Sequence, residues 1–270
     1  MSVPIALTIA GSDSGGGAGI QADIKAMSAL GVYAASVITA LTAQNTCKVH
    51  SIYPVSTDFI QDQIHTVFED LDIKAVKIGM LGTPAIIQAV ADALRDYPKI
   101  PIVLDPVMVA KSGDKLLQDD AIESLKNSLL PMARIITPNL PEAAVLTGMN
   151  EPTSLDEMRE LLGALKEMQV KSILLKGGHL GGDTSDDLFF DGHIDTCLST
   201  PRINTTNSHG TGCTLSASIA SGLAKGLPLM DAVTEAKTYL SNALQHADTL
   251  GVGKGHGPVH HFHAFWPRKV

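Results

Sequence analysis

The chain has 270 residues, of which 44 % are apolar and 18 % are charged, and its net charge is −8 at pH 7. This length and apolar content predict a single globular domain over residues 1–270 and exclude an intrinsically disordered chain. The acidic charge is not interrupted by any basic run, which argues against a nucleic-acid partner.

The three cysteines, Cys47, Cys197 and Cys213, have neither the spacing of a disulfide framework nor that of a CxxC zinc pair. We expect Cys47 and Cys197 to be reduced and buried. The N-terminus lacks the cationic segment of a signal peptide, and the apolar run 100–110 is interrupted by Asp105 and is too short to span a bilayer. These features predict a cytoplasmic protein without a membrane partner.

Short apolar runs alternate with longer amphipathic runs along the chain. The alternation predicts an α/β fold whose central, mostly parallel sheet carries helices on both faces. Two apolar runs around Asp191-Gly192 predict a β-hairpin, and the glycine- and histidine-rich residues 251–263, which lack regular metal-ligand spacing, are predicted to form a surface tail. In chain order, the predicted strands are 3–10, 33–42, 75–79, 101–105, 135–137, 171–175, 187–190 and 193–197, and the predicted helices are 18–30, 57–70, 84–95, 121–130, 155–168, 211–225 and 229–246.

The segments with candidate chemistry follow the predicted strands, and ligands of doubly wound sheets bind beyond the carboxyl ends of the strands. The first segment, 11–19, is rich in glycine and lies between a strand and a helix. Its N–H groups can face an anion or a polar ligand, or the segment can be a tight turn. It only loosely imitates a dinucleotide fingerprint, because Thr42–Thr46 stands where that motif requires an acidic residue.

Three further segments offer oxygen ligands or a cation. Asp105 ends a predicted strand, where a carboxylate can bind Mg²⁺ together with phosphate oxygens or cap a helix. Asn139 and Glu142, three residues apart at a strand-to-helix junction, can bind Mg²⁺ or its water shell, or form a capping box. Lys176 precedes two glycines and can reach a phosphate or be a solvated lysine at a turn.

The turn Gly210-Thr211-Gly212-Cys213 opens a predicted helix and has the most weight. The N–H groups and the positive dipole end of a helix N-terminus can hold a transferring phosphoryl group. The same field lowers the pKa of a cysteine, so a Cys213 thiolate can accept a hydroxyl proton, although Cys213 can also be a small packing residue. His209 is an alternative base or orients the loop. Walker A and protein-kinase signatures are absent, so a kinase of this sequence belongs to neither of those classes.

Together these segments resemble the ribokinase-like superfamily and, within it, the hydroxymethylpyrimidine and phosphomethylpyrimidine kinases of thiamine synthesis. The resemblance implies an α/β three-layer sandwich, with the first glycine segment facing the pyrimidine rather than the ATP phosphates. It also implies a homodimer. The segments that carry it are AGSDSGGGAGIQAD at 10–23, TALTAQNT at 39–46, KIGML at 77–81, DPVMVAKSGD at 105–114, TPNLPEA at 137–143, LLKGGH at 174–179 and HGTGCTLSA at 209–217.

The resemblance implies roles for the residues at matching positions. Cys213 stands where the wider superfamily has an aspartate base, and Gly210 and Gly212 frame the turn that cradles the phosphoryl group. Ala110–Lys115 is implied to be a lid that excludes water. The implied pyrimidine contacts are Gly11, Gln44 and Val107, with Asp23 and Met80 as pocket wall; the implied Mg²⁺–phosphate group is Asp105, Asn139 and Glu142; the implied ATP contacts are Lys176 and Thr211.

The main functional hypothesis is a bifunctional kinase that uses ATP and Mg²⁺. It phosphorylates 4-amino-5-hydroxymethyl-2-methylpyrimidine and then the monophosphate. The alternative is a pyridoxine/pyridoxal kinase, whose substrate is also a flat ring with a hydroxymethyl group, although Gln44 and Met80 favour the pyrimidine. A non-catalytic nucleotide sensor is disfavoured by the complete set of candidate site residues. A nicotinamide oxidoreductase is disfavoured by the missing ribose-binding acid.

Overall fold

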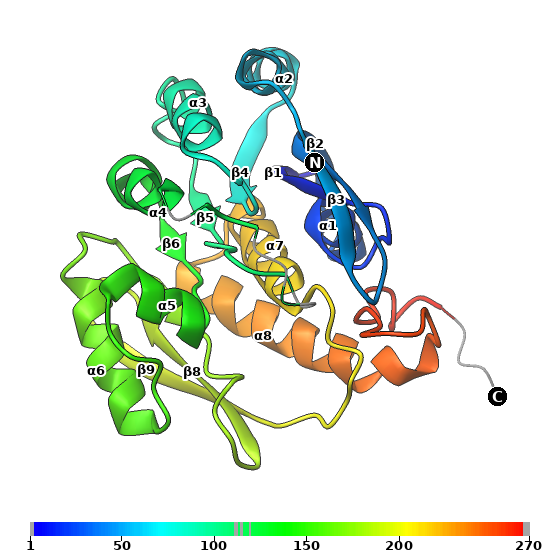
Figure 1. Ribbon diagram of the computed structural model, residues 1–270, viewed down its shortest axis with the longest axis vertical. Coiled ribbons are helices and arrows are strands. Elements are labelled where there is room, and N and C mark those ends of the chain that lie inside the picture. Colours follow the sequence, from blue (N-terminus) through cyan, green and yellow to red (C-terminus); the bar gives the residue numbers. More distant parts are fainter. Residues whose placement is uncertain (1–2, 111–112, 114–115, 119, 267–270) are drawn as a thin grey trace.

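The computed structural model describes residues 3–110, 113, 116–118 and 120–266, and these residues form one nine-stranded sheet flanked by helices (Figure 1). The strands are β1 (Ile5–Asp13), β2 (Tyr33–Gln44), β3 (Val49–Pro54), β4 (Ile73–Ile78), β5 (Ile102–Leu104), β6 (Ile135–Ile136), β7 (Ile173–Leu175), β8 (Thr184–Phe190) and β9 (Asp195–Pro201).

The sheet has the order β3-β2-β1-β4-β5-β6-β7-β8-β9. Every pair from β2 to β7 is parallel, whereas β3 is antiparallel to β2, and the β7–β8 and β8–β9 pairs are antiparallel. The predicted mostly parallel sheet is therefore confirmed. Its carboxyl edge collects the ends of six parallel strands, which is where the candidate site residues were predicted to meet.

The central strands are apolar on both faces. On β5, Val103 packs into one core cluster and its neighbour Leu104 into the other, and Ile135 and Ile136 divide in the same way on β6. Because successive side chains of a strand point to opposite faces, a strand covered on both sides forms a continuous apolar run. This is the pattern from which the strands were predicted.

The helices form two outer layers, which completes the predicted three-layer sandwich. One core cluster draws on α1, α7 and α8, and the other on α2, α3, α5 and α6 (Figure 1). The helices are α1 (Gly19–Ala29), α2 (Thr57–Asp70), α3 (Pro84–Leu94), α4 (Ala121–Ser124), α5 (Leu140–Thr147), α6 (Leu155–Lys166), α7 (Thr211–Ala224) and α8 (Leu229–Gln245), with short turns η1 (Leu125–Leu129), η2 (Leu130–Met132) and η3 (Ala247–Thr249).

The continuous helix predicted over 121–130 is wrong. The α-helical pattern ends at Ser124 and continues as a π-helical turn, η1, and a 3₁₀ turn, η2. Pro131 lies in the first turn of η2 and has no N–H to donate to the carbonyl of residue 127, so a regular α-helix cannot continue through it.

Strand β3 was not predicted. It is an edge strand whose residues are mostly exposed, so it lacks the apolar alternation that identifies a half-buried strand. The predicted hairpin is confirmed, but its loop is four residues long, because Phe190 pairs with Asp195. The Asp191 carboxylate shapes this loop by accepting hydrogen bonds from the N–H groups of His193 (2.7 Å) and Ile194 (2.8 Å).

The surface tail predicted over 251–263 is wrong in its second half. Val259, His260 and His261 are buried, and His261 Nε2 lies 2.9 Å from Thr214 Oγ1 on α7. The start of α7 and the end of α8 contact this segment, because the His260 N–H also donates to the Ala243 carbonyl at 3.0 Å. In the described part of the chain, moreover, no cluster of three or more His, Cys, Asp or Glu side chains could hold a metal ion.

The expected burial of two cysteines is wrong, and the expected lid lies mostly outside the described residues. Cys47 and Cys197 are exposed rather than buried, because Cys47 lies in the loop after β2 and Cys197 on the outer face of the edge strand β9. The lid expected over Ala110–Lys115 rests on residues 111, 112, 114 and 115, which lie outside the described residues. Within the described part, none of the helices combines the length and apolar character needed to cross a bilayer.

Candidate active site

A cavity of about 730 Å³ lies at the carboxyl edge of the parallel strands and is closed on one side by the N-terminus of α7. Residues just beyond the ends of successive strands line it. Gln44 ends β2, Asp105 follows β5, Asn139 follows β6 and Lys176 follows β7. The predicted meeting of the segments is therefore confirmed, although they are far apart in sequence.

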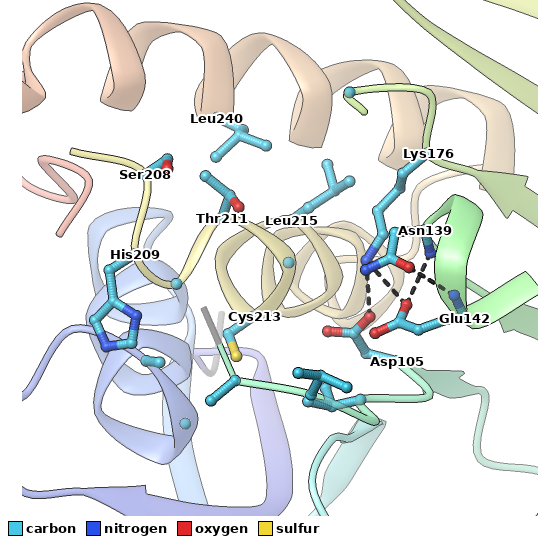
Figure 2. Close-up of a pocket in the computed structure, with 18 of the residues that line it drawn as sticks. Asp105, Asn139, Glu142, Lys176, Ser208, His209, Thr211, Cys213, Leu215 and Leu240 are labelled. Carbon is cyan, nitrogen blue, oxygen red and sulfur yellow. Dashed lines mark hydrogen bonds and ion pairs between the residues drawn. The ribbon is translucent and has the colours of Figure 1, made fainter. Parts of the chain in front are cut away.

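A buried carboxylate–lysine cluster lies at one end of the cavity (Figure 2). Lys176 Nζ lies 3.0 Å from Asp105 Oδ1 and 4.0 Å from Glu142 Oε2. Thr137 Oγ1 donates to Asp105 Oδ1 (3.1 Å) and Ser216 Oγ donates to Asp105 Oδ2 (3.4 Å). Burial by itself lowers the pKa of Lys176, but the two carboxylates outweigh burial and raise it, so the lysine stays charged.

Glu142 is the member of this cluster whose pKa is raised most clearly. Burial, reinforced by the negative charge of Asp105, raises the pKa of Glu142 to about 7 against the lowering effect of Lys176. Two buried carboxylates thus share one lysine. The remaining negative charge and the hard oxygen donors fit a divalent cation such as Mg²⁺.

Asn139 and Glu142 also form a complete capping box at the start of α5. Asn139 Oδ1 accepts from the Glu142 N–H and Glu142 Oε2 accepts from the Asn139 N–H, both at 2.8 Å. The capping alternative is therefore confirmed. The capping oxygen, Glu142 Oε2, is also the one that lies 4.0 Å from Lys176 Nζ, so the capping box holds the carboxylate beside Lys176 (Figure 2).

The first turn of α7 lies directly beside the cluster. A Cβ atom at Gly212 would lie 3.3 Å from both Asp105 Oδ2 and Lys176 Nζ. Gly210 at the N-cap has no side chain to cap this helix, and the Thr211 N–H donates to the Ser208 carbonyl at 3.4 Å. Thr211 and Cys213 also line the cavity. The site therefore combines a helix N-terminus, a lysine and a carboxylate pair around one space.

The expected low pKa of Cys213 is contradicted. Burial raises the pKa of this thiol to about 11, against the lowering effect of Lys77, and the carboxylates of Asp23 and Asp105 add to the rise. Desolvation of the thiolate outweighs the helix dipole here. The thiol is therefore protonated at neutral pH in the ligand-free protein.

The first glycine segment folds around its own carboxylate, which sequence reasoning missed. Asp13 accepts hydrogen bonds from the N–H groups of Gly15 (2.8 Å), Gly17 (3.0 Å) and Ala18 (2.9 Å). These three N–H groups are therefore satisfied within the turn, while Gly11, Asp13 and Gly19 of the same segment line the cavity. An aspartate two residues before a run of glycines is the signal that indicates such a turn.

Asp13 also joins this segment to the turn before α7. Its Oδ2 lies 2.9 Å from His209 Nε2. Burial by itself raises the pKa of Asp13, but the hydrogen bonds from His209, Ala18 and Gly15 outweigh it and hold the pKa below its ordinary value. Of the two options for His209, the geometry supports the loop-orienting one. In Figure 2, His209 lies on the far side of Cys213 from Lys176.

The expected pyrimidine contacts fall together, with one exception. Gly11, Gln44, Met80 and Val107 all line the cavity, and a Cβ atom at Gly11 would lie 2.8 Å from Met80 Sδ. The exception is Asp23, which was expected in the pocket wall and does not line the cavity. It faces the core from α1, where a carboxylate needs a partner.

That partner is Lys77, a second residue that sequence reasoning missed. Lys77 Nζ lies 2.8 Å from Asp23 Oδ2 and 3.0 Å from Asp23 Oδ1, and both side chains are completely buried. Thr8 Oγ1 also donates to Asp23 Oδ2 (2.6 Å). Burial lowers the pKa of Lys77, but the adjacent carboxylate outweighs this and raises it. The signal was present in the sequence as a lysine between the apolar residues Val76 and Ile78.

A third ion pair supports the turn that carries Lys176. Lys237 Nζ on α8 lies 2.5 Å from Asp187 Oδ2, and Asp187 Oδ1 accepts from the Gly177 N–H at 2.9 Å. A Cβ atom at Gly177 would lie only 1.9 Å from the Asp186 carbonyl oxygen. Strand β8 therefore approaches too closely for any side chain at position 177, and glycine is required there.

Known proteins with similar sequences are kinases of the phosphomethylpyrimidine family. The profile of the family described as phosphomethylpyrimidine kinase matches residues 13–260. The chain is 56 % identical over 262 residues to the hydroxymethylpyrimidine/phosphomethylpyrimidine kinase of Rhizobium meliloti, with 97 % of this chain and 98 % of that protein covered.

Two solved structures resemble the fold closely. An ADP complex of Bacillus subtilis pyridoxal kinase has a TM-score of 0.89 at 34 % identity, covering 96 % of this chain and 98 % of the other. A phosphomethylpyrimidine kinase from Clostridium difficile has a TM-score of 0.78 at 43 % identity, covering 89 % and 99 %. The chain is therefore a kinase with a ribokinase-like fold, and it belongs to the phosphomethylpyrimidine kinase family.

Proposed function

We propose that this chain transfers the γ-phosphate of ATP to the hydroxymethyl oxygen of 4-amino-5-hydroxymethyl-2-methylpyrimidine and then phosphorylates the monophosphate to the diphosphate, as part of thiamine synthesis. The name of the Rhizobium meliloti relative, which is 56 % identical, supports both steps. One structural observation carries the proposal: the first turn of α7 lies beside the pair formed by Lys176 and Asp105.

The turn Gly210–Cys213 is the proposed seat of the transferring phosphoryl group. Charge spreads over three phosphoryl oxygens in this reaction, so catalysis depends on positioning and on charge stabilisation. First-turn N–H groups and the helix dipole supply fixed partial positive charge, and Lys176 supplies a full charge. We assign Thr211 and Lys176 to ATP, and the ADP complex of the Bacillus subtilis pyridoxal kinase supports a nucleotide in this fold.

Asp105 and Glu142 are the proposed residues for Mg²⁺, with Asn139 acting through its hydrogen bonds to Glu142 rather than as a direct ligand. A divalent ion held by these residues would supply positive charge for the phosphate groups. The unneutralised carboxylate pair supports this assignment, because Glu142 has a pKa of about 7 only while Asp105 and burial oppose its charge. In the ligand-free protein Lys176 forms an ion pair with Asp105.

Cys213 is the proposed acceptor of the hydroxyl proton. It stands on the first turn of α7, lines the cavity, and lies between His209 and the Lys176 cluster in Figure 2. Its pKa of about 11 means that little thiolate is present at neutral pH, so proton removal by this route gains with rising pH. The assignment therefore predicts a distinctive pH profile, described below.

Gln44, Gly11, Val107 and Met80 are the proposed ring-binding set. The amide of Gln44 can pair with a ring nitrogen and the neighbouring amine of an aminopyrimidine. Gly11 lets the ring approach the β1 backbone, and the Met80 thioether packs against that position. Asp23 is not in this set, because it is buried behind Lys77.

The experiment is an ADP-release assay with Mg²⁺-ATP, run in parallel with the hydroxymethylpyrimidine, its monophosphate and pyridoxal. Turnover of the first two supports the proposal. Pyridoxal kinase is the second candidate, because a solved pyridoxal kinase shares the fold at a TM-score of 0.89. Turnover of pyridoxal alone would transfer the assignment to that activity and remove the ring-binding role of Gln44.

A further inference from the structure

The segment 251–261, which we call the C-terminal strap, follows α8 and η3 and contacts the loop after β2 and the loop before α7. In Figure 1 it lies against the end of the β2–β3 hairpin and beside the end of α8. Its first part holds the loop after Gln44. Thr46 Oγ1 accepts from the N–H groups of Lys254 (3.2 Å) and Gly255 (3.1 Å), and the Thr46 carbonyl accepts from the His256 N–H (3.0 Å).

The second part of the strap holds the loop before α7. The His209 N–H donates to the Gly257 carbonyl at 3.0 Å, and the Val259 N–H donates to the His209 carbonyl at 3.4 Å. The Gly257 N–H donates to Asn207 Oδ1 at 3.0 Å. Asn207 Nδ2 in turn donates to Asp248 Oδ1 at 2.7 Å, so both ends of this loop are tied to the chain that follows α8.

His209 is the point where these connections meet. The strap holds its backbone on both sides, and its ring lies 2.9 Å from the Asp13 carboxylate, which organises the first glycine segment. The next residue, Gly210, has φ 79° and packs so tightly that a Cβ atom would lie 1.9 Å from the Gly17 carbonyl oxygen. The phosphoryl-binding turn is therefore fixed from outside its own helix.

We infer that the C-terminal strap is a positioning element for phosphoryl transfer: it sets the separation between the ring-binding loop that follows Gln44 and the phosphoryl-binding turn at Gly210–Cys213. This inference rests on the proposed function for its catalytic consequence. The strap touches neither the Lys176 cluster nor Cys213 through any contact described above. It acts through Thr46, Asn207 and His209, which adjoin the two halves of the site.

The glycines of the strap show how little freedom these contacts allow. A Cβ atom at Gly255 would lie 2.2 Å from the Thr46 carbonyl oxygen, and one at Gly257 would lie 2.3 Å from Asn207 Oδ1 and 3.2 Å from the Val252 carbonyl oxygen. A segment that merely covered the surface would not need such close approach. Since a misplacement of about 1 Å can cost on the order of 10²-fold in rate, contacts this tight are suited to alignment.

The test is a double-mutant cycle between the strap and the loop that it holds. Gly257→Ala places a methyl group on the Asn207 amide, and Asn207→Ala removes that amide. We expect Gly257→Ala to lower kcat for the pyrimidine by roughly 10- to 100-fold with the KM for ATP nearly unchanged. The double variant should fall no further than Asn207→Ala alone, because the methyl then has room. Gly163→Ala in α6, whose Cβ meets nothing within 4 Å, is the matched control.

A readout that does not depend on activity separates this inference from the proposed function. Amide hydrogen exchange over residues 44–48 and 205–212 should be faster in Gly257→Ala and unchanged in Gly163→Ala. If the wild type fails to phosphorylate the pyrimidine but exchange is faster in Gly257→Ala, the proposed function is overturned and the role of the strap in holding the two loops is supported. Wild-type kcat and exchange in Gly257→Ala, or a double variant whose loss is the product of the single losses, would overturn the positioning role.

Discussion

Lys176 Nζ lies 3.0 Å from Asp105 Oδ1, so in the ligand-free protein the proposed phosphate-binding lysine is paired with the proposed magnesium-binding carboxylate. Each charge is satisfied by the other while the substrates are absent. A buried lysine without such a partner would be costly, as would a buried carboxylate. Arrival of a phosphate and a divalent cation together lets the two separate without leaving either charge unpaired. Under the proposed function, we therefore expect ATP and its metal to bind together.

The charge left on Glu142 predicts a stability effect. Its pKa is raised to about 7 in the folded protein, so the folded state binds a proton more readily than the unfolded state. The contribution of Glu142 to the free energy of unfolding is therefore largest below about pH 4.5, and it falls as the pH rises through 7. In EDTA, Glu142→Gln should raise Tm at pH 8 and have little effect at pH 5, measured by thermal unfolding.

Glu157 supplies the control for this prediction. It occupies the equivalent third position of α6, but it is exposed, and hydrogen bonds from Thr153 lower its pKa. The stability contribution of such a group is present at high pH and lost in acid, which is the opposite sign. Glu157→Gln should not raise Tm at pH 8. An equal rise of Tm in the two variants at pH 8 would show that the charged form of Glu142 does not destabilise the folded protein.

The proposed role of Cys213 predicts the pH dependence of turnover. A base with a pKa of about 11 gains thiolate by about tenfold for each pH unit below that value. Log kcat/KM for the pyrimidine should therefore rise with pH up to 9 without reaching a plateau. In Cys213→Ala the rise should disappear while ATP binding is kept. A flat profile in the wild type would remove Cys213 as the base.

The buried pair of Lys77 and Asp23 predicts non-additive stability changes. Asp23→Asn leaves the Lys77 charge unpaired in the core and should lower the free energy of unfolding by about 3–5 kcal/mol. Adding Lys77→Met to Asp23→Asn should recover most of that loss, as measured by urea unfolding. Asp72→Ala, which removes the partner of Lys74 in an exposed pair, should change nothing measurable. Equal losses in the single and double variants would contradict the account.

Gln44 is predicted to read the ring. Gln44→Ala should raise the KM for the pyrimidine several-fold more than the KM for ATP, because only the pyrimidine loses a hydrogen-bonding partner. The same variant should not improve turnover of pyridoxal. The measurement is a pair of saturation curves with each substrate varied in turn. Equal effects on the two KM values would place Gln44 outside the ring-binding set.

Much of the fold was predictable from sequence because the central strands are buried on both faces. The runs around Leu104 and Ile136 are apolar without interruption, and turn residues separate them from amphipathic helices. Strand β3 escaped prediction because an exposed edge strand needs no apolar pattern. The break at Ser124 required the geometry of η1, which a helical periodicity does not disclose.

The sequence predicted that most of the candidate residues would lie together at one edge of the sheet, but it did not predict the interactions between them. Strand-end positions of Asp105, Asn139 and Lys176 followed from the topology of parallel sheets. Asp13 and Lys77 escaped prediction because their partners, His209 and Asp23, lie far away in sequence. The pKa of a thiol depends on desolvation by the finished fold, so the helix N-terminus alone suggested the wrong direction for Cys213.

The most direct measurement is kcat for the pyrimidine in Gly212→Ala. The added methyl would lie 3.3 Å from Asp105 Oδ2 and from Lys176 Nζ, inside the space assigned to the phosphoryl group. Alanine is favoured over glycine within a helix by about 1 kcal/mol, so the fold should not suffer. We predict a loss of at least about 100-fold in kcat with Tm unchanged or higher, while Gly163→Ala keeps full activity. Wild-type kcat in Gly212→Ala would contradict transfer at this turn.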